Sequence, residues 1–172
     1  DNEMQNYLKV CVERIGFIPN VIKANATDNK RLKAFSVFYN RLMVDENRLT
    51  KLEKEMIAVV VSSINRCFYC LISHGAAIRK LTKNSILAEK LVINYRIADI
   101  SKKHKCMLTF ANKLTIESYL IQEDDRNNLR KEGFNDQDIL EIVEVTSFFN
   151  MTNRIASGTE MMPNEEYHNM DR

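Results

Sequence analysis

Helical periodicity, continued with few interruptions along the chain, is the feature that most constrains the fold. Apolar residues recur at intervals of three and four, for example at Leu32, Phe35, Phe38, Tyr39 and Leu42. The 172 residues include only four Gly, two Pro and no Trp. Because Gly and Pro mark most turns between strands, their scarcity leaves few places for a sheet to turn. The pattern predicts an all-α protein.

Capping and turn residues divide the chain into expected helices. Thr50 and Glu53 form a capping-box pattern, with Glu53 expected in solvent, and Gly16 and Gly133 are typical of helix ends. The run from Met56 to Ile64 is apolar nearly all round, which predicts a buried helix. We expect helices at about residues 3–15, 28–43, 50–64, 67–81, 85–93, 101–119, 122–132 and 135–161, with a short segment after Pro19.

These helices are expected to form a single domain over residues 1–172. An N-terminal helical arm at about 1–45 precedes a core at about 46–160. The C-terminal tail, 161–172, is expected to be exposed or packed on a neighbouring subunit.

Composition argues against several classes of function. The net charge is +2 and the two signs alternate along the chain, so no basic patch indicates a nucleic-acid partner. No apolar run approaches the roughly 18 residues of a membrane-spanning helix. We expect no secretory signal and, because no initiator Met is present, a few residues upstream of Asp1. Four cysteines are too sparse for a disulfide scaffold, so we expect a cytoplasmic protein. We also expect that it has no cofactor.

The stretch NRCFYCLISHGAAIRK, from Asn65 to Lys80, holds the residues best suited to chemistry. On a helix, the Cβ atoms of Cys67 and Cys70 would lie about 5–6 Å apart, within reach of a disulfide after small adjustment. His74 follows one turn later on the same face, so its ring is expected to reach the thiol of Cys70.

The expected position of Cys67 at a helix start favours a reactive thiolate. Free backbone N–H groups and the positive end of the helix dipole both stabilise negative charge there. The His74 imidazole is expected to accept the proton of Cys70, and it works better with a partner that holds its tautomer. Glu55, at the edge of the apolar run, is the best candidate because it is expected to be partly buried and reachable from the next helix.

Two other interpretations of these residues remain open. Cys67 and Cys70 can be small buried side chains, with His74 a core residue and Glu55 a solvated charge. Alternatively, the two thiols and the imidazole can be three ligands of a structural zinc ion. The fourth ligand would come from Cys11, Cys106, His104 or His168, although no second CxxC or HxxxH pattern accompanies them.

Asn150, Asn153 and Arg154 interrupt the last apolar helix. Because buried amides need hydrogen-bond partners, these residues either line a pocket or make structural or subunit contacts.

The spacing of the four candidate residues resembles a known motif. Glu55, eleven intervening residues, Cys67-x-x-Cys70, three residues and His74 resemble the E-x11-C-x-x-C-x3-H motif of AhpD-like alkylhydroperoxidases. These proteins belong to the carboxymuconolactone decarboxylase superfamily. The segments EKEMIAVVVSSINRCFYCLISHGAAIRK and EGFNDQDILEIVEVTSFFNMTNRIASG, followed by MPNEEY, are similar to its peroxidase-related branch, and the resemblance covers most of residues 15–167.

The resemblance implies an all-helical domain whose core is an antiparallel helix pair carrying the motif, assembled as a homo-oligomer. It implies that Cys70 attacks a hydroperoxide, that Cys67 resolves the sulfenic acid to a disulfide, and that His74 and Glu55 relay protons. A thiol or lipoyl-type protein would then reduce the disulfide.

Tyr69 departs from the family pattern, because the AhpD proteins proper carry a second His there. A phenol donates a hydrogen bond but is a poor base near neutral pH, so Tyr69 is at most a supporting residue, as is Asn153. The decarboxylases of the superfamily generally lack the cysteine pair, which disfavours decarboxylation. The leading hypothesis is a thiol peroxidase for antioxidant defence, and the alternatives are a redox sensor or oligomeric interaction protein and a zinc-binding domain.

Overall fold

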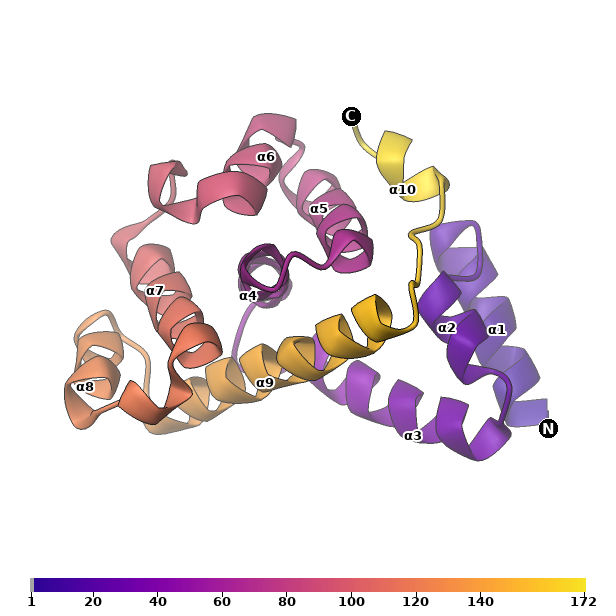
Figure 1. Cartoon of the computed structure of the whole chain (residues 1–172), viewed down its shortest axis with the longest axis horizontal. Helices are drawn as coiled ribbons and strands as arrows, with labels where there is room; N and C mark the ends of the chain where they lie inside the picture. The colour runs from indigo at the N-terminus through magenta and orange to yellow at the C-terminus, as the bar shows by residue number, and fades with distance from the viewer. Residues whose placement is uncertain (1) are drawn as a thin grey trace.

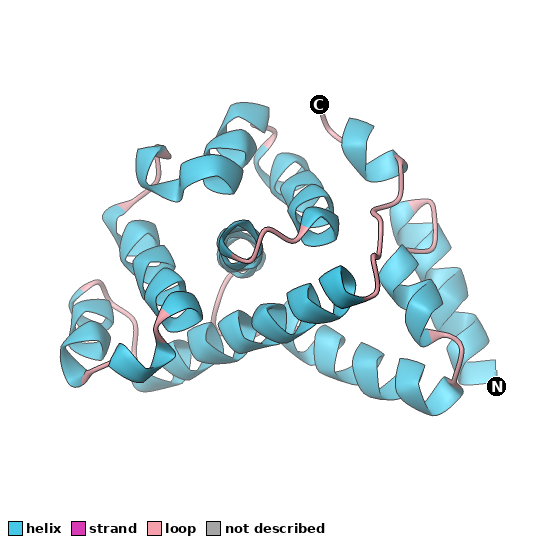
Figure 2. Ribbon diagram, viewed as in Figure 1, coloured by secondary structure: helices cyan, strands magenta, loops and turns pink. Residues whose placement is uncertain are grey.

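Residues 2–172 are described by the computed structural model, and this part of the chain contains helices and no strand (Figures 1 and 2). The all-α prediction is therefore confirmed. The α-helices are α1 (Asn2–Ile15), α2 (Asn20–Asn25), α3 (Asn29–Tyr39), α4 (Lys51–Ile64), α5 (Phe68–Thr82), α6 (Ser85–Asn94), α7 (Lys102–Ile116), α8 (Glu123–Lys131), α9 (Asp136–Gly158) and α10 (Glu166–Asn169). A π-helix covers Asn40–Val44, and 3-10 turns cover Tyr95–Ile97 and Ser118–Leu120.

Helix α4 lies at the centre of the molecule, where Figure 1 shows it end-on with α5, α6, α7 and α9 around it. Every residue from Glu53 to Ser62 is buried. The prediction of a buried helix from Met56 onward is confirmed, and burial begins one turn earlier than the apolar run. A helix buried on all sides must satisfy its polar side chains through neighbouring helices rather than through water.

The start of α4 shows the predicted capping box, but Glu53 is not in solvent. The Glu53 N–H donates to Thr50 Oγ1 at 3.2 Å, and Glu53 Oε2 accepts from the Thr50 N–H at 2.8 Å. Only 4% of Glu53 is exposed, because α7 covers it and places Lys103 and His104 next to its carboxylate. Burial alone would raise the pKa of Glu53, but hydrogen bonds from His104 and Thr50 and the charge of Lys103 lower it to about 2.

A tight turn joins α4 to α5 and positions the first cysteine. Arg66 adopts a left-handed conformation with φ of 52°. The N–H of Cys67 then donates to the Ser62 carbonyl at 3.0 Å, which is the bond that closes a Schellman motif. Cys67 thereby becomes the N-cap of α5, as the sequence predicts for a helix starting at or near it. From this turn α5 runs back along α4, which brings His74 next to Glu55.

The helix predicted at 28–43 ends differently from expectation. Its last turn widens into the π-helix, where the Asp45 N–H donates to the Asn40 carbonyl at 2.9 Å. Two adjacent apolar residues, Leu42 and Met43, are both buried there. Similarly, the helix predicted at 101–119 stops at Ile116.

The C-terminal tail, predicted to be exposed or packed on a neighbouring subunit, is exposed in part and also packs on its own chain. Asn164 is buried, accepts from the Asn20 N–H at 2.8 Å and donates to the Ile18 carbonyl at 3.1 Å. Arg79 of α5 donates to the carbonyls of Tyr167 and Met170 at 2.7 and 2.8 Å. The tail therefore packs over α2 and α5 of its own chain, because hydrogen bonds join its backbone and the Asn164 amide to these helices. None of the helices within residues 2–172 combines the length and the apolar character that crossing a membrane requires.

A buried ion pair joins α4 to α9. Lys54 Nζ lies 3.4 Å from Glu141 Oε1 and donates to the Asp45 carbonyl at 3.1 Å, and the side chain of Lys54 is 2% exposed. Glu141 Oε2 also accepts from the N–H groups of Arg48 and Leu49, at 3.0 and 3.3 Å. Glu141 thus accepts hydrogen bonds from two backbone N–H groups of the loop before α4, and its charge neutralises Lys54.

We expect Lys54→Met to lower the free energy of unfolding by about 3–5 kcal/mol, because it leaves the Glu141 carboxylate buried without its cation. Chemical denaturation followed by circular dichroism measures this loss. The double variant Lys54→Met/Glu141→Gln should recover most of it. Lys9→Met, at a side chain that is 74% exposed, is the matched control and should change stability by less than about 1 kcal/mol. Equal effects of Lys54→Met and Lys9→Met would contradict the role of the buried pair.

Candidate active site

The two cysteines of the CxxC motif lie together at the start of α5. Cys67 is the N-cap and Cys70 is in the first turn, and both are free thiols with 1% and 4% exposure. The thiol of Cys70 donates a hydrogen bond to the sulfur of Cys67. The expectation that the thiols lie within reach of each other agrees with this contact.

The electrostatics of the pair place the resting negative charge on Cys67. The hydrogen bond from the Cys70 thiol is the largest influence and lowers the pKa of Cys67 to about 6, against the opposing effect of burial. The Cys70 backbone N–H, the Ser157 hydroxyl and the charge of His74 lower this pKa further. The sequence also predicts a lowered pKa for Cys67, because free backbone N–H groups at a helix start stabilise a thiolate. The N–H of Cys70 is one of these free groups in the first turn of α5.

The pKa of Cys70 is shifted in the opposite direction. Its hydrogen bond to the Cys67 thiolate raises the pKa of Cys70 far above its ordinary value, and burial adds to the effect. Hydrogen bonds with Asn153 and Ser62 act against this rise. The two pKa values are therefore shifted in opposite directions, so the pair favours negative charge on Cys67 over Cys70.

His74 and Glu55 form a pair across the interface of α4 and α5. His74 Nδ1 lies 2.7 Å from Glu55 Oε2, and the two side chains are 12% and 5% exposed. The His74 ring also meets the edge of the Phe149 ring, with centroids 4.6 Å apart. Glu55 thus holds the imidazole by one nitrogen and leaves the other nitrogen, Nε2, available to the site.

The sequence predicted that His74 would reach the Cys70 thiol directly, and among the described residues no hydrogen bond joins them. Helix geometry allows the contact, but packing decides otherwise: Glu55 and Phe149 orient the imidazole, while Cys67, Asn153 and Ser62 orient the thiol. The two side chains instead line one cavity.

The two sulfurs open onto different cavities. The inner cavity, about 80 Å³ in volume, is lined by Cys70 and His74, by the polar side chains of Asn25 and Thr152, and by apolar and aromatic side chains such as Phe148 and Phe149. The outer cavity, about 420 Å³, is lined by Arg66, Cys67, Phe68, Ser157, Glu160 and Met162. Tyr69, Ala156 and Met161 line both. A third cavity of about 220 Å³, lined in part by Glu55, Tyr39 and Tyr167, adjoins the inner cavity at His74.

Tyr69, in the position that departs from the family motif, has a structural contact. Its hydroxyl oxygen accepts a hydrogen bond from the Val21 N–H at 3.2 Å, which connects α5 to α2. Burial raises the pKa of Tyr69 to about 12, although its hydrogen bond with Val21 has the opposite effect. The phenol is therefore neutral at physiological pH and does not act as a base there.

Asn153, predicted to line a pocket or to make structural contacts, lies directly behind the cysteines. It donates to Ser62 Oγ at 3.0 Å, accepts from Asn65 Nδ2 at 3.0 Å and contacts the Cys70 thiol. Asn150, by contrast, bonds Asn65 and Thr115 and accepts from Arg154, away from the sulfurs.

The sequence interpretation missed Ser62 and Ser157, which support the two sulfurs. Ser62 lies two turns after Glu55 on the same face of α4, so its spacing was a usable signal. Ser157 lies near the end of α9, and nothing in its local sequence indicates a partner on α5.

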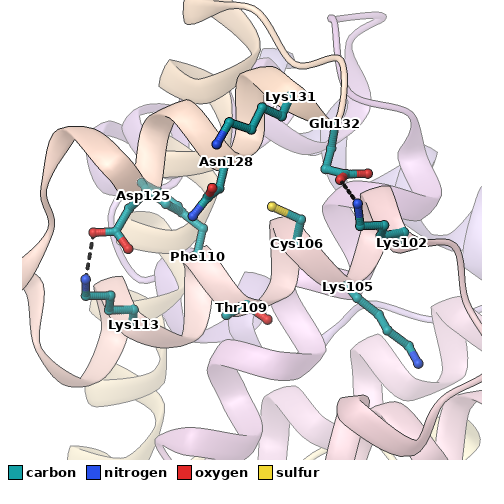
Figure 3. A pocket seen from close by; sticks show the side chains of 10 residues that line it. All are labelled: Lys102, Lys105, Cys106, Thr109, Phe110, Lys113, Asp125, Asn128, Lys131 and Glu132. Carbon is teal, nitrogen blue, oxygen red and sulfur yellow. Dashed lines mark hydrogen bonds and ion pairs between the residues drawn. The ribbon is translucent and has the colours of Figure 1, made fainter.

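The zinc hypothesis receives no support from the arrangement of side chains. Within residues 2–172, no three His, Cys, Asp or Glu side chains are grouped closely enough to hold a metal ion. Cys106 faces a cavity of about 520 Å³ between α7 and α8, away from α5 (Figure 3). Lysines surround it there, with Lys102 paired to Glu132 and Lys113 paired to Asp125 (Figure 3). This is the largest cavity described, but it holds none of the motif residues.

Comparisons with known proteins identify the family of the chain. The sequence model of the carboxymuconolactone decarboxylase family matches residues 31–99. A peroxidase-related protein from Silicibacter sp. TM1040 is 55% identical, with a TM-score of 0.97 over all of this chain and 90% of that one. A peroxidase-related protein with an alkylhydroperoxidase AhpD core, from Ralstonia eutropha JMP134, is 35% identical, with a TM-score of 0.95 over the same shares.

A more distant structure shares the fold alone. The debrominase Bmp8 is 15% identical, with a TM-score of 0.82 over 98% of this chain and 90% of that one. No curated protein matches the chain significantly. Because two relatives, 55% and 35% identical, match the whole chain and share its full fold, the chain belongs to the AhpD-like, peroxidase-related branch of the carboxymuconolactone decarboxylase superfamily.

Proposed function

We propose that this protein is a thiol peroxidase that reduces organic hydroperoxides to alcohols with the thiols of Cys67 and Cys70. The observation that supports it most directly is the shared inner cavity of Cys70 and His74, with Cys67 hydrogen-bonded behind Cys70. A substrate oxygen in this cavity would meet a sulfur nucleophile and a proton donor together. Membership in a peroxidase-related family agrees with this chemistry.

The first step transfers the proton of Cys70 to Cys67. In the resting pair, the Cys67 thiolate already accepts the hydrogen bond from Cys70, so it is the base nearest to that proton. The transfer produces a Cys70 thiolate that Asn153 and Ser62 stabilise by hydrogen bonds. Cys70 attacks a peroxide in this thiolate form, because the thiol is a much weaker nucleophile.

The second step breaks the O–O bond of the hydroperoxide. The Cys70 sulfur attacks the terminal oxygen and becomes a sulfenic acid, while the other oxygen leaves with the electron pair as an alkoxide. His74, oriented by Glu55 through Nδ1, gives the alkoxide its Nε2 proton and regains one from solvent, so that an alcohol departs and the proton count closes. Cys67 then attacks the sulfenic sulfur, water leaves, and the Cys67–Cys70 disulfide forms.

The lining of the inner cavity favours an organic substrate. Most of the other lining residues are apolar or aromatic, such as Phe148 and Phe149, with Asn25 and Thr152 as polar exceptions, and burial of apolar groups against them stabilises a bound alkyl chain.

The proposal includes a cytoplasmic homo-oligomer and a thiol or lipoyl-type protein as the reductant. Exposed apolar side chains on α3 and α9 support subunit contacts, because a monomer would leave them in water. They include Val37, Phe38, Met151 and Ile155, each at least 45% exposed. A redox sensor is the alternative: it would form the disulfide rapidly, but no reductant would sustain a cycle.

Replacement of the nucleophile tests the reaction. We expect Cys70→Ser to slow the consumption of cumene hydroperoxide by on the order of 100-fold or more, because the attacking sulfur is lost. Cys67→Ser should still form one sulfenic acid but no intramolecular disulfide, which mass spectrometry detects after trapping with dimedone. Cys106→Ser is the matched control. Activity of Cys70→Ser equal to the parent would exclude the mechanism.

The pH dependence follows from the lowered pKa of Cys67. The thiolate forms as the pH rises through about 6, so peroxide consumption should increase across that range and then level off. An ordinary thiol would instead titrate near 8.5. The ultraviolet absorbance of the thiolate measures the midpoint, and Cys70→Ala should move it upward by removing the largest stabilising hydrogen bond. Burial raises the pKa of Cys11 and Cys106, so neither should titrate in this range. A midpoint that Cys70→Ala leaves unchanged would contradict the assignment.

The role of the His74–Glu55 pair depends on the leaving group of the substrate. We expect His74→Gln and Glu55→Gln to slow the reduction of cumene hydroperoxide by about 10- to 100-fold, because its alkoxide needs a proton. Peracetic acid releases acetate, which is stable without one, and its reduction should change by less than about threefold. Stopped-flow rates with the two oxidants provide the comparison, and equal losses for both would show that the pair only supports the structure.

A further inference from the structure

We propose that the two halves of the catalytic cycle use opposite sides of the CxxC motif. The peroxide reaches Cys70 through the inner cavity, and an external thiol reduces the disulfide by attacking Cys67 through the outer cavity. The inference deepens the proposed function and rests on it for the oxidative half. The reductive half can be examined on its own, because the disulfide can be prepared without peroxide.

The two cysteines line separate cavities. Cys70 lines the inner cavity and Cys67 the outer one, and neither cysteine lines both. Tyr69, Ala156 and Met161 lie between them as a shared wall. A reagent in one cavity therefore meets one sulfur only.

The dimensions and the rim of the outer cavity suit a thiol rather than a peroxide substrate. Its volume of about 420 Å³, against about 80 Å³ for the inner cavity, leaves room for the carbon chain of a dithiol beside Cys67. Cys67 is 1% exposed, so the attacking thiol must enter the cavity to reach it. Phe68 and Met162, 48% and 60% exposed, form an apolar rim that packs against the carbon chain of a reductant.

Two charged side chains line the same cavity and act on an approaching thiolate. Arg66 attracts the negative sulfur, and Glu160 repels it. The cavity holds no imidazole, so it lacks the group that would protonate an alkoxide.

The thiolate of an external dithiol attacks Cys67 Sγ, which forms a mixed disulfide and breaks the Cys67–Cys70 bond. Cys70 leaves with the electron pair and takes the proton that the second thiol of the reductant gives up. The second thiol of the reductant then attacks its own sulfur in the mixed disulfide and releases the Cys67 thiolate. The dithiol loses two electrons and both cysteines regain the resting state.

The raised pKa of Cys70 in the resting pair does not make it a poor leaving group here. That pKa is raised mainly by the neighbouring Cys67 thiolate. In the disulfide Cys67 carries no charge, so its effect on Cys70 is absent. The hydrogen bonds from Asn153 and Ser62 then stabilise the departing thiolate. Access to the sulfur therefore decides which one is attacked.

A chemical map identifies the attacked sulfur. The protein is oxidised with diamide, reacted briefly with the monothiol glutathione, quenched in acid and alkylated. Chymotryptic cleavage at Phe68 and Tyr69 separates the two cysteines before mass spectrometry. We expect glutathione on Cys67 in at least about tenfold excess over Cys70, since only Cys67 lines the outer cavity. Glutathione on Cys70, or on both equally, would overturn the inference.

A charge series tests the route. Dihydrolipoate and dihydrolipoamide are dithiols that differ by one carboxylate. We expect Glu160→Lys to accelerate the reduction of the disulfide by dihydrolipoate about three- to tenfold, with Glu160→Gln intermediate and dihydrolipoamide affected less. Glu89→Lys, the same charge change on α6 outside both cavities, is the matched control. An equal effect of both Lys variants, or none from Glu160→Lys, would exclude the outer cavity as the route.

Disulfide formation by cumene hydroperoxide tests the proposed function separately. Wild-type protein that forms no Cys67–Cys70 disulfide with cumene hydroperoxide would refute the peroxidase, and with it the peroxide route to Cys70. The diamide-oxidised protein would still show which sulfur the thiol attacks. Rapid disulfide formation by peroxide, followed by glutathione on Cys70, would keep the peroxidase and refute the two-sided cycle.

Discussion

The burial of α4 on all sides is the constraint on which the rest of the structure depends. Its polar side chains have no water to bond, so each requires a partner from a surrounding helix. Lys54 is neutralised by Glu141 of α9, Glu55 bonds His74 of α5, and Ser62 accepts from Asn153 of α9. These contacts fix the positions of α5 and α9 relative to α4. The candidate site is thus built from the same interactions that satisfy a buried helix.

The short turn at Arg66 places the two cysteines at the start of α5, where α5 packs against α4. It ends α4 and starts α5 within three residues, so that Cys67 caps the new helix while α5 folds back along α4. One result is a thiol pair in which a single hydrogen bond lowers one pKa and raises the other. Another is that the proton donor His74, one turn beyond Cys70, is oriented by a carboxylate on the preceding helix.

The contrast between the two sulfurs arises from their surroundings rather than from their spacing. Cys67 lies at the helix start beside Ser157, and Cys70 lies one turn inward beside Asn153 and Ser62. Burial disfavours charge on both, so hydrogen bonds decide which one is ionised. A pair arranged in this way stores one negative charge and can move it between the sulfurs by the transfer of a single proton.

Local sequence signals predicted much of the fold and of the candidate site. Helical periodicity and the scarcity of Gly and Pro predicted the all-α fold, the apolar run predicted the buried α4, and the spacing of Glu55, Cys67, Cys70 and His74 predicted the residues gathered at α5. These are local signals, because neighbours at three and four residues share a helix face. Only the tertiary structure decided that His74 turns to Glu55 and Phe149 rather than to Cys70, that Glu53 is buried, and that the tail closes on its own chain. Each of these depends on which side chain of a distant helix arrives at the same place, and the periodicity of one helix carries no information about that.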